Sequence, residues 1–254
     1  MSALLIALAM AATSPSLVVL ESPWMRIEFD TALGAIRYLG SRDGVNFVEP
    51  LHVSKADIRQ GHPLDPGGLA WELSTATASE PVLLGKPMTV LSHSETHLSL
   101  RPANEYEALP EIRIDIRLSE SDPSAVMEVT VGGLDDVEPA AMRVLCRVSP
   151  TATVHAPDAP NPTRRLSLYP DAFTLAAQGR TAETLVYNKA ETETRLSGHT
   201  LLRQCEAIPA PALYVVDDEF TGVSGTVVES RWDAILPGQP HLYRETWTLS
   251  GTDE

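Results

Sequence analysis

The stretch that decides the fold runs from Ile112 to Val148 and contains three segments of alternating residues. These read IRIDIRL at 112–118, AVMEVTV at 125–131 and AMRVLCRV at 141–148. In each segment an apolar side chain recurs at every second position. A period of two directs apolar side chains to one face of a sheet and polar ones to the other, so the pattern predicts three strands.

The segments between these strands favour turns and loops. SESDPS at 119–124 and GGLDDVEPA at 132–140 are rich in Ser, Asp, Pro and Gly. The first separator is short, and it predicts an antiparallel hairpin that has one core face and one wet face.

Length and composition extend this prediction to the whole chain. The protein has 254 residues, 43% of them hydrophobic, and its 20 prolines disfavour long helices. Further alternating segments surround the middle block, including 24–30 before it and 242–249 at the end; two more strands are expected at 225–229 and 232–236. We therefore predict one all-β domain over residues 16–254, an antiparallel sandwich of many short strands.

The charge balance excludes some partners. The formal net charge is −15, from 34 acidic and 19 basic residues. A nucleic-acid or anionic-membrane surface needs clustered Lys and Arg, so neither partner is expected. The excess of acid is interpreted as a source of solubility.

Residues 2–12, SALLIALAMAA, form a short apolar run that is followed by TSPS at 13–16, and residues 1–15 are predicted to be a signal peptide or apolar leader. The run is too short to span a bilayer. Its length and small residues suit a cleaved secretory signal, although a positively charged start is missing. The prediction is a secreted or periplasmic protein; a first strand or helix of a cytoplasmic protein is the alternative. Cys146 and Cys205 are the only cysteines, and either a disulfide or buried free thiols fits the sequence.

Three motifs together resemble the galactose-mutarotase-like β-supersandwich families, which include the aldose epimerases. The first is MRIEFDTALGAIRYLGSRDGVNFVEP at 25–50, with its strand, Gly-containing turn, strand and apolar pair before a proline. The second is GGLAW at 67–71, and the third is LPGQPHLYRETWTL at 236–249. The resemblance covers most of the chain after residue 16, and it implies a supersandwich fold and a sugar as ligand.

Enzymes of the resembling family open and reclose a hexose ring with a histidine acid and a carboxylate base. Their histidine usually follows the middle β block, where this chain has Leu145, Cys146 and Arg147. The nearest histidine is His155, in a Pro-rich stretch. His155 is therefore the candidate acid, and weak or absent epimerase activity is expected.

The candidate base is Glu245, which shares a strand face with two aromatic residues. An apolar setting would raise its pKa and suit proton abstraction, whereas an exposed edge-strand position is the alternative. Trp71 follows two glycines and could stack on a sugar ring; a core position is its alternative. Arg37 and His62 complete the candidate ligand-binding set, with a solvated loop as the alternative for His62.

No metal or cofactor is expected. His93 and His97 flank Glu95, but a zinc motif at that spacing needs a helix, and the surrounding pattern is that of strands. The chain has no phosphate-binding loop, dinucleotide fingerprint or paired CxxC motif. Two functions remain: carbohydrate recognition in a cleft, with or without epimerase activity, and a structural or protein-interaction module of the cell envelope. The first requires the candidate side chains to converge.

Overall fold

The computed structural model describes residues 16–49, 67–74, 85–103, 111–132, 140–149, 151–155, 191–207, 212–217, 226–235 and 240–251. The leader at 1–15 and His62 lie outside these residues. The described chain contains strands and no helix, which confirms the all-β prediction. Within the described residues, no helix is long and apolar enough to cross a membrane.

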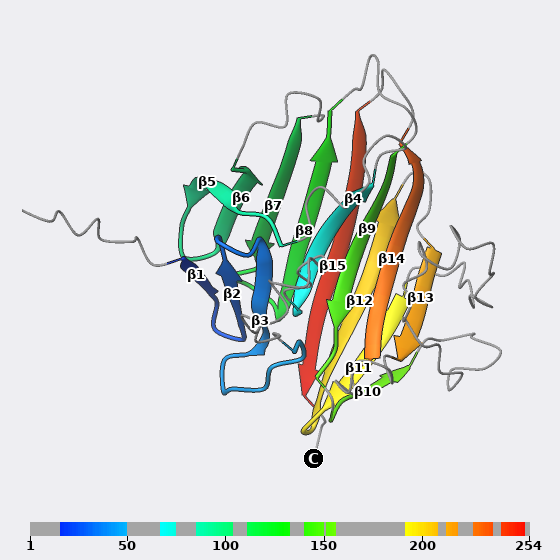
Figure 1. Ribbon diagram of the computed structural model, residues 1–254. Helices are drawn as coiled ribbons and strands as arrows, with labels where there is room; N and C mark the ends of the chain where they lie inside the picture. Colours follow the sequence, from blue (N-terminus) through cyan, green and yellow to red (C-terminus); the bar gives the residue numbers. More distant parts are fainter. Residues whose placement is uncertain are drawn as a thin grey trace, which may run out of the picture.

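The strands form two antiparallel sheets that stack face to face (Figure 1). The seven-stranded sheet has the order β1 (Leu17–Glu21), β2 (Met25–Asp30), β3 (Ala35–Ser41), β4 (Leu69–Ser74), β9 (Ala140–Arg147), β14 (Thr226–Ile235) and β13 (Ala212–Asp217). The eight-stranded sheet has the order β10 (Thr153–His155), β11 (Glu191–Leu196), β12 (His199–Ala207), β15 (His241–Gly251), β8 (Ser124–Val131), β7 (Ile112–Leu118), β6 (His97–Pro102) and β5 (Met88–His93).

The middle block is divided between the two sheets. β7 and β8 form the predicted hairpin, with Ile112 opposite Val131 and Leu118 opposite Ala125. β9 instead lies in the seven-stranded sheet, between β4 and β14. β8 and β9, which are consecutive in the chain, therefore lie in different sheets. The two strands expected at 225–229 and 232–236 are one strand, β14, with a register shift between Trp232 and Ile235.

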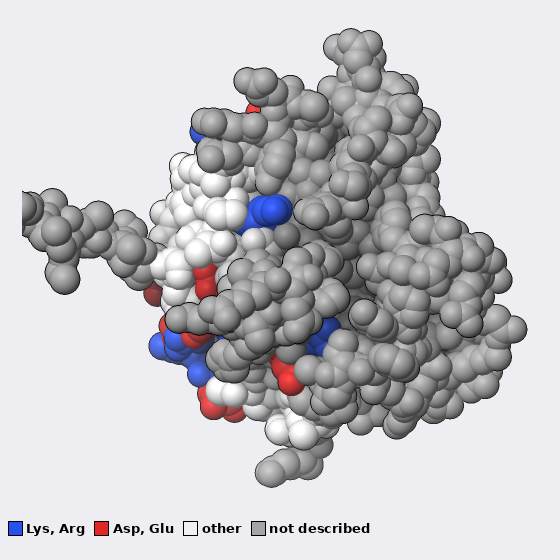
Figure 2. Space-filling model, viewed as in Figure 1, with Lys and Arg blue, Asp and Glu red and all other residues white. Residues whose placement is uncertain are grey.

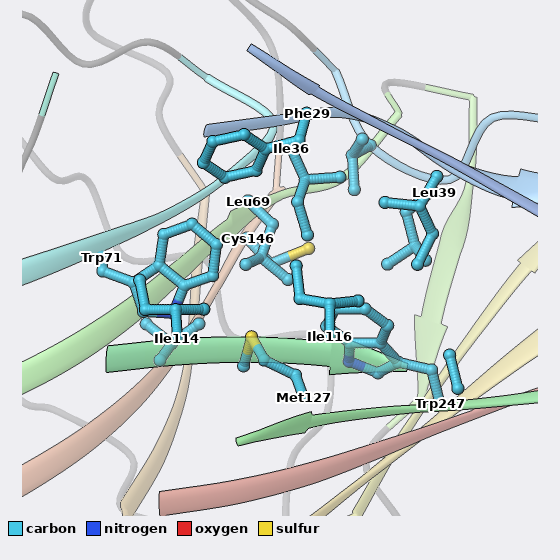
Figure 3. Close-up of a cluster of buried hydrophobic side chains, with 14 of the residues drawn as sticks. Phe29, Ile36, Leu39, Leu69, Trp71, Ile114, Ile116, Met127, Cys146 and Trp247 are labelled. Carbon is cyan, nitrogen blue, oxygen red and sulfur yellow. The ribbon is translucent and has the colours of Figure 1, made fainter. Parts of the chain in front are cut away.

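The core lies between the sheets and follows the period of two. Along β8 the burial alternates strictly, and the inward residues of β7 have almost no exposed surface. Ile114 and Met127 of one sheet meet Trp71 and Cys146 of the other in a single apolar cluster (Figure 3). Burial of these side chains is the main favourable term in the folding of such a sandwich.

The outer face of the eight-stranded sheet carries a ladder of ion pairs. Arg113 Nε lies 2.7 Å from Asp115 Oδ2, and Glu128 accepts hydrogen bonds from Arg117 and Arg244, each at 2.7 Å. Burial by itself raises the pKa of Asp115, but hydrogen bonds led by that of Arg113 outweigh it and lower the pKa. The Arg117 hydrogen bond is the main cause that lowers the pKa of Glu128. Such cross-strand pairs stabilise a wet sheet face.

Candidate functional site

The predicted site residues do not converge among the side chains that the structure describes. Arg37 lies on the outer face of the seven-stranded sheet, where it faces Asp30. Trp71 and Glu245 lie between the two sheets, each with no exposed surface. His155 belongs to β10, at the far edge of the eight-stranded sheet, and its side chain is outside the described part of the structure.

Trp71 occupies a core position. Its ring centroid lies 5.9 Å from that of Phe29 at an interplanar angle of 42°, and the two rings lie side by side in Figure 3. Since the indole is 0% exposed, it offers no face to a sugar. The structure thus places Trp71 in the alternative position, inside the sandwich, and not on the wall of a site.

Glu245 is the centre of a buried polar cluster. Its carboxylate accepts hydrogen bonds from Arg203 Nε, from Tyr243 Oη at 2.6 Å and from Trp247 Nε1 at 2.6 Å. Arg203 comes from the neighbouring strand β12, directly opposite Trp247. Glu245 and Arg203 have 0% and 2% of their side chains exposed.

The electrostatics of this cluster correct the predicted role of Glu245. Burial alone raises its pKa, but the Arg203 charge and the three hydrogen bonds outweigh burial, so the pKa lies below its ordinary value. The expectation of a raised pKa is therefore wrong, because sequence alone did not show the arginine partner. The edge-strand alternative is also wrong, since β15 lies between β12 and β8. An ionised carboxylate sealed between two sheets acts as a structural ion pair.

The cysteines and histidines provide no further described centre. Cys146 and Cys205 are both buried and neither forms a disulfide bond, and burial raises the pKa of Cys146. His93 Nε2 contacts the Val19 carbonyl oxygen at 3.1 Å, whereas His97 Nε2 lies 3.3 Å from Asp115. No group of three or more His, Cys, Asp or Glu in the described ranges is placed to hold a metal ion.

A different set of polar residues does come together, on the outer face of the seven-stranded sheet. Gly68 lies between Arg37 on β3 and Arg147 on β9. The Arg147 N–H donates to the Gly68 carbonyl oxygen at 2.7 Å. A Cβ built on Gly68 would lie 2.0 Å from the Ile36 carbonyl oxygen and 3.7 Å from Arg37 Cα, and Gly68 has a φ of +66°. Only glycine fits this position, which leaves no side chain between the two arginines.

Glu49 joins the same set through its backbone. Its N–H donates to the Arg147 carbonyl oxygen at 2.9 Å, and its carbonyl oxygen accepts from the Gly68 N–H at 2.7 Å. The carboxylate is half-buried, and its buried oxygen Oε2 has no hydrogen-bond partner among the described residues. Burial raises the pKa of Glu49, and the charge of Arg147 offsets only part of that rise. We refer to Arg37, Glu49, Gly68 and Arg147 as the arginine–glycine row.

The surroundings of the arginine–glycine row are small and apolar. Ala35, Ala70 and Leu145 are cross-strand neighbours on β3, β4 and β9, and they pack together outside the main core. Arg147 is only 6% exposed and the Arg37 side chain 20%. Charges that are partly shielded from water interact more strongly with a bound group than they would on an open surface.

Charges elsewhere on the described surface pair locally. On the face in Figure 2, acidic and basic side chains lie close together at the left, over β1–β3. Arg26 and Arg42 there form ion pairs with Glu28 and Glu21, each at 2.6 Å. Exposed pairs of this kind contribute little to stability and define no site.

Sequence reasoning missed Glu49 and Arg147 as candidates. Arg147 was noted only as the residue that stands in place of a histidine. Glu49 lies between the apolar pair Phe47 and Val48 and Pro50, inside the first motif of the resemblance. Each of these residues lies near the end of its motif or alternating segment. Residues at the ends of neighbouring strands can lie side by side on one face of a sheet, so this position was the available signal.

These strands and their order define an all-β, antiparallel supersandwich of the galactose-mutarotase-like type. No protein-family model matches the sequence, and no curated protein matches it. Solved structures with the same fold include a proposed aldose 1-epimerase from Escherichia coli K12, with a TM-score of 0.58, 10% identity, and coverage of 92% of this chain and 99% of that chain.

Two further similar structures come from lactobacilli. A galactose mutarotase related enzyme from Lactobacillus acidophilus has a TM-score of 0.59 and 11% identity, with 94% of this chain and 98% of that chain covered. A galactose mutarotase-like protein from Lactobacillus casei ATCC 334 has a TM-score of 0.59 and 10% identity, with 92% and 100% covered. At these identities the likeness establishes the fold.

Proposed function

We propose that the protein recognises a carbohydrate on the outer face of the seven-stranded sheet, at the arginine–glycine row. The observation that carries the proposal is the backbone arrangement around Gly68, which is hydrogen-bonded to Glu49 and Arg147 and lies beside Arg37. Guanidinium groups donate to sugar hydroxyls, a carboxylate accepts from them, and a glycine lets a ligand approach the backbone. The fold supports this proposal, because similar structures are described as mutarotase-like proteins.

A more specific proposal is that the same site catalyses opening of the sugar ring. It needs a proton donor and a proton acceptor within reach of one sugar. Glu245 is sealed in the core, so Glu49 is the described carboxylate that suits the acceptor role. A guanidinium group is not used as a general acid, so Arg147 is not proposed as the proton donor. His155 remains the proposed donor, and we expect at most weak mutarotase activity on free aldohexoses.

Two assays separate binding from catalysis. Isothermal titration against sugars selected from a glycan array should show binding to the wild type that is lost in Glu49→Gln and Arg147→Met. Arg195→Met is the matched control, because Arg195 is 58% exposed and lies in the other sheet. Polarimetry on fresh glucose and galactose tests the chemistry, with His155→Ala as the variant. Absence of binding to every glycan would favour the interaction-module alternative and end the proposal.

A further inference from the structure

Among the tryptophans whose burial the structure describes, Trp24 alone is open to water. It is 36% exposed, whereas Trp71 and Trp247 have no exposed surface. Trp24 directly precedes β2, and a short turn fixes its backbone: the Ser22 hydroxyl accepts hydrogen bonds from the N–H groups of Trp24 and Met25, at 3.4 and 3.1 Å. An exposed indole on a fixed backbone offers a large apolar surface at a low entropic cost.

The pairing of β2 with β3 places a second aromatic residue and an arginine beside Trp24. The Arg42 N–H donates to the Trp24 carbonyl oxygen at 3.1 Å. The Tyr38 hydroxyl donates to the Ser41 carbonyl oxygen at 2.6 Å, and Ser41 is the cross-strand partner of Met25, the residue after Trp24. Trp24, Tyr38 and Arg42 therefore share one corner of the seven-stranded sheet, which we call the Trp24 corner.

The charges of the Trp24 corner balance one another. Arg26 and Arg42 form the ion pairs with Glu28 and Glu21 described above, and the guanidinium carbon of Arg26 also lies 5.9 Å from the centroid of the Tyr38 ring. These two cations and two anions leave no excess positive charge that would attract an anionic polymer. The ion pairs alone define no site, and the case rests on the exposed indole beside them.

Arg42 retains hydrogen-bond donors. Its side chain is 60% exposed, and its ion pair with Glu21 is made by Nε at 2.6 Å. Among the described residues, no hydrogen bond or ion pair involves its two Nη groups. A guanidinium in this state can donate to two neighbouring hydroxyl groups. The next residue, Asp43, is 66% exposed and keeps the surroundings acidic, so an uncharged hydroxyl suits these donors better than an anion.

The Trp24 corner and the arginine–glycine row lie at two points along β3. Gly68 lies beside Ile36 and Arg37 near the start of this strand, and Arg42, which is hydrogen-bonded to Trp24, directly follows its end. Six residues of extended chain from Ile36 to Arg42 span about 20 Å. This span is longer than one sugar ring, so a single monosaccharide does not reach both places.

We propose that the ligand is an uncharged oligosaccharide that runs along β3, with one sugar unit at Gly68 and Glu49 and a later unit stacked on the Trp24 indole. This inference rests on the proposed function and names the size and charge class of its ligand. The indole covers the apolar C–H face of the later ring, while Arg42 donates to hydroxyls at the rim of that ring.

The test compares neutral glycans of increasing length on the full-length wild-type protein. A glycan array carries α-1,4-glucan, β-1,4-glucan, β-1,4-galactan and β-1,4-mannan series, each from the monosaccharide to the hexasaccharide, and isothermal titration measures the series that binds best. We expect the long members to bind about 10-fold more tightly than the monosaccharide, or more, as stacking and added hydrogen bonds allow. The long members should also protect Trp24 from acrylamide quenching, with Trp24→Phe as the reference for its fluorescence.

Variants then assign the gain in affinity to Trp24. Trp24→Ala should reduce the affinity for the long glycan to that for the monosaccharide and leave the monosaccharide affinity unchanged, and Trp24→Phe should keep part of the gain. Leu242→Ala is the matched control, because Leu242 is a large apolar side chain, 49% exposed, in the other sheet. It should change neither affinity.

The outcomes distinguish this inference from the proposed function beneath it. Equal affinity for the monosaccharide and the long glycans overturns the oligosaccharide inference and leaves carbohydrate recognition standing. A length preference that persists in Trp24→Ala overturns the role of Trp24. Protection of Trp24 that grows with protein concentration in the absence of glycan would show a second copy of the chain on this corner and also overturn it. Absence of binding throughout all four series overturns both proposals.

Discussion

Removal of one partner from the Arg203–Glu245 pair should destabilise the protein far more than removal of both. The Arg203→Met variant leaves the Glu245 carboxylate buried with hydrogen bonds only from Tyr243 and Trp247. Glu245→Gln leaves the Arg203 guanidinium, which is 2% exposed, without a counter-charge. Breaking a buried pair in this way costs about 3–5 kcal/mol. In a protein of this size that corresponds to a fall in Tm of roughly 6–20 °C.

The double variant Arg203→Met, Glu245→Gln should recover most of this loss. Two neutral side chains of similar volume avoid the desolvation of both charges, and such replacements are often neutral or stabilising. Urea unfolding of the wild type, both single variants and the double variant gives the coupling energy of the pair. Single variants that cost less than about 1 kcal/mol would refute the reasoning, as would a double variant that loses the sum of the two single costs.

Three further predictions concern stability. Trp71→Ala should cost about 3–5 kcal/mol in urea unfolding, as large aromatic truncations do; a well-folded variant that loses only ligand would return Trp71 to the site. Gly68→Ala should lower the Tm by several degrees, because its Cβ meets a backbone oxygen at 2.0 Å, whereas Gly251→Ala, with no atom within 4 Å, should not. The pKa values of Asp115 and Glu128 are lowered in the folded protein, so both carboxylates stabilise the fold when they are ionised. Their full contribution is present above the unfolded-state pKa values of about 4, and it is lost as the pH falls through the lower folded-state values. A urea midpoint that is unchanged from pH 6 to pH 3 would contradict this.

The period of two predicted the strands of the middle block and their inward faces, because it is a local property, whereas β10 and β11 were not predicted. Ile114, Met127 and Cys146 all point into the core, as their alternation indicates. The pattern did not predict which sheet each strand joins. β9 pairs with β14, roughly 80 residues later in the chain, and no local signal encodes such a distant partner.

The candidate site depended on the same distant pairings. Glu245 shares a strand face with two aromatic residues in the sequence. Burial there raises its pKa, but the charge of Arg203, 42 residues away, and the hydrogen bonds to Glu245 outweigh burial and lower the pKa. Glu49, Gly68 and Arg147 come from three separate motifs, and only the sheet brings their backbones within hydrogen-bond distance. The resemblance drew attention to the segments that contain Glu49 and Gly68, but the pairing of strands was needed to place Arg147 beside them.

The most direct test of the proposed site is a crystal structure of the protein soaked with a sugar that the glycan array selects. We expect the sugar on the outer face of the seven-stranded sheet, within hydrogen-bond distance of the Glu49 carboxylate. A sugar bound on the eight-stranded sheet or between the sheets near Trp71 would contradict the proposed site.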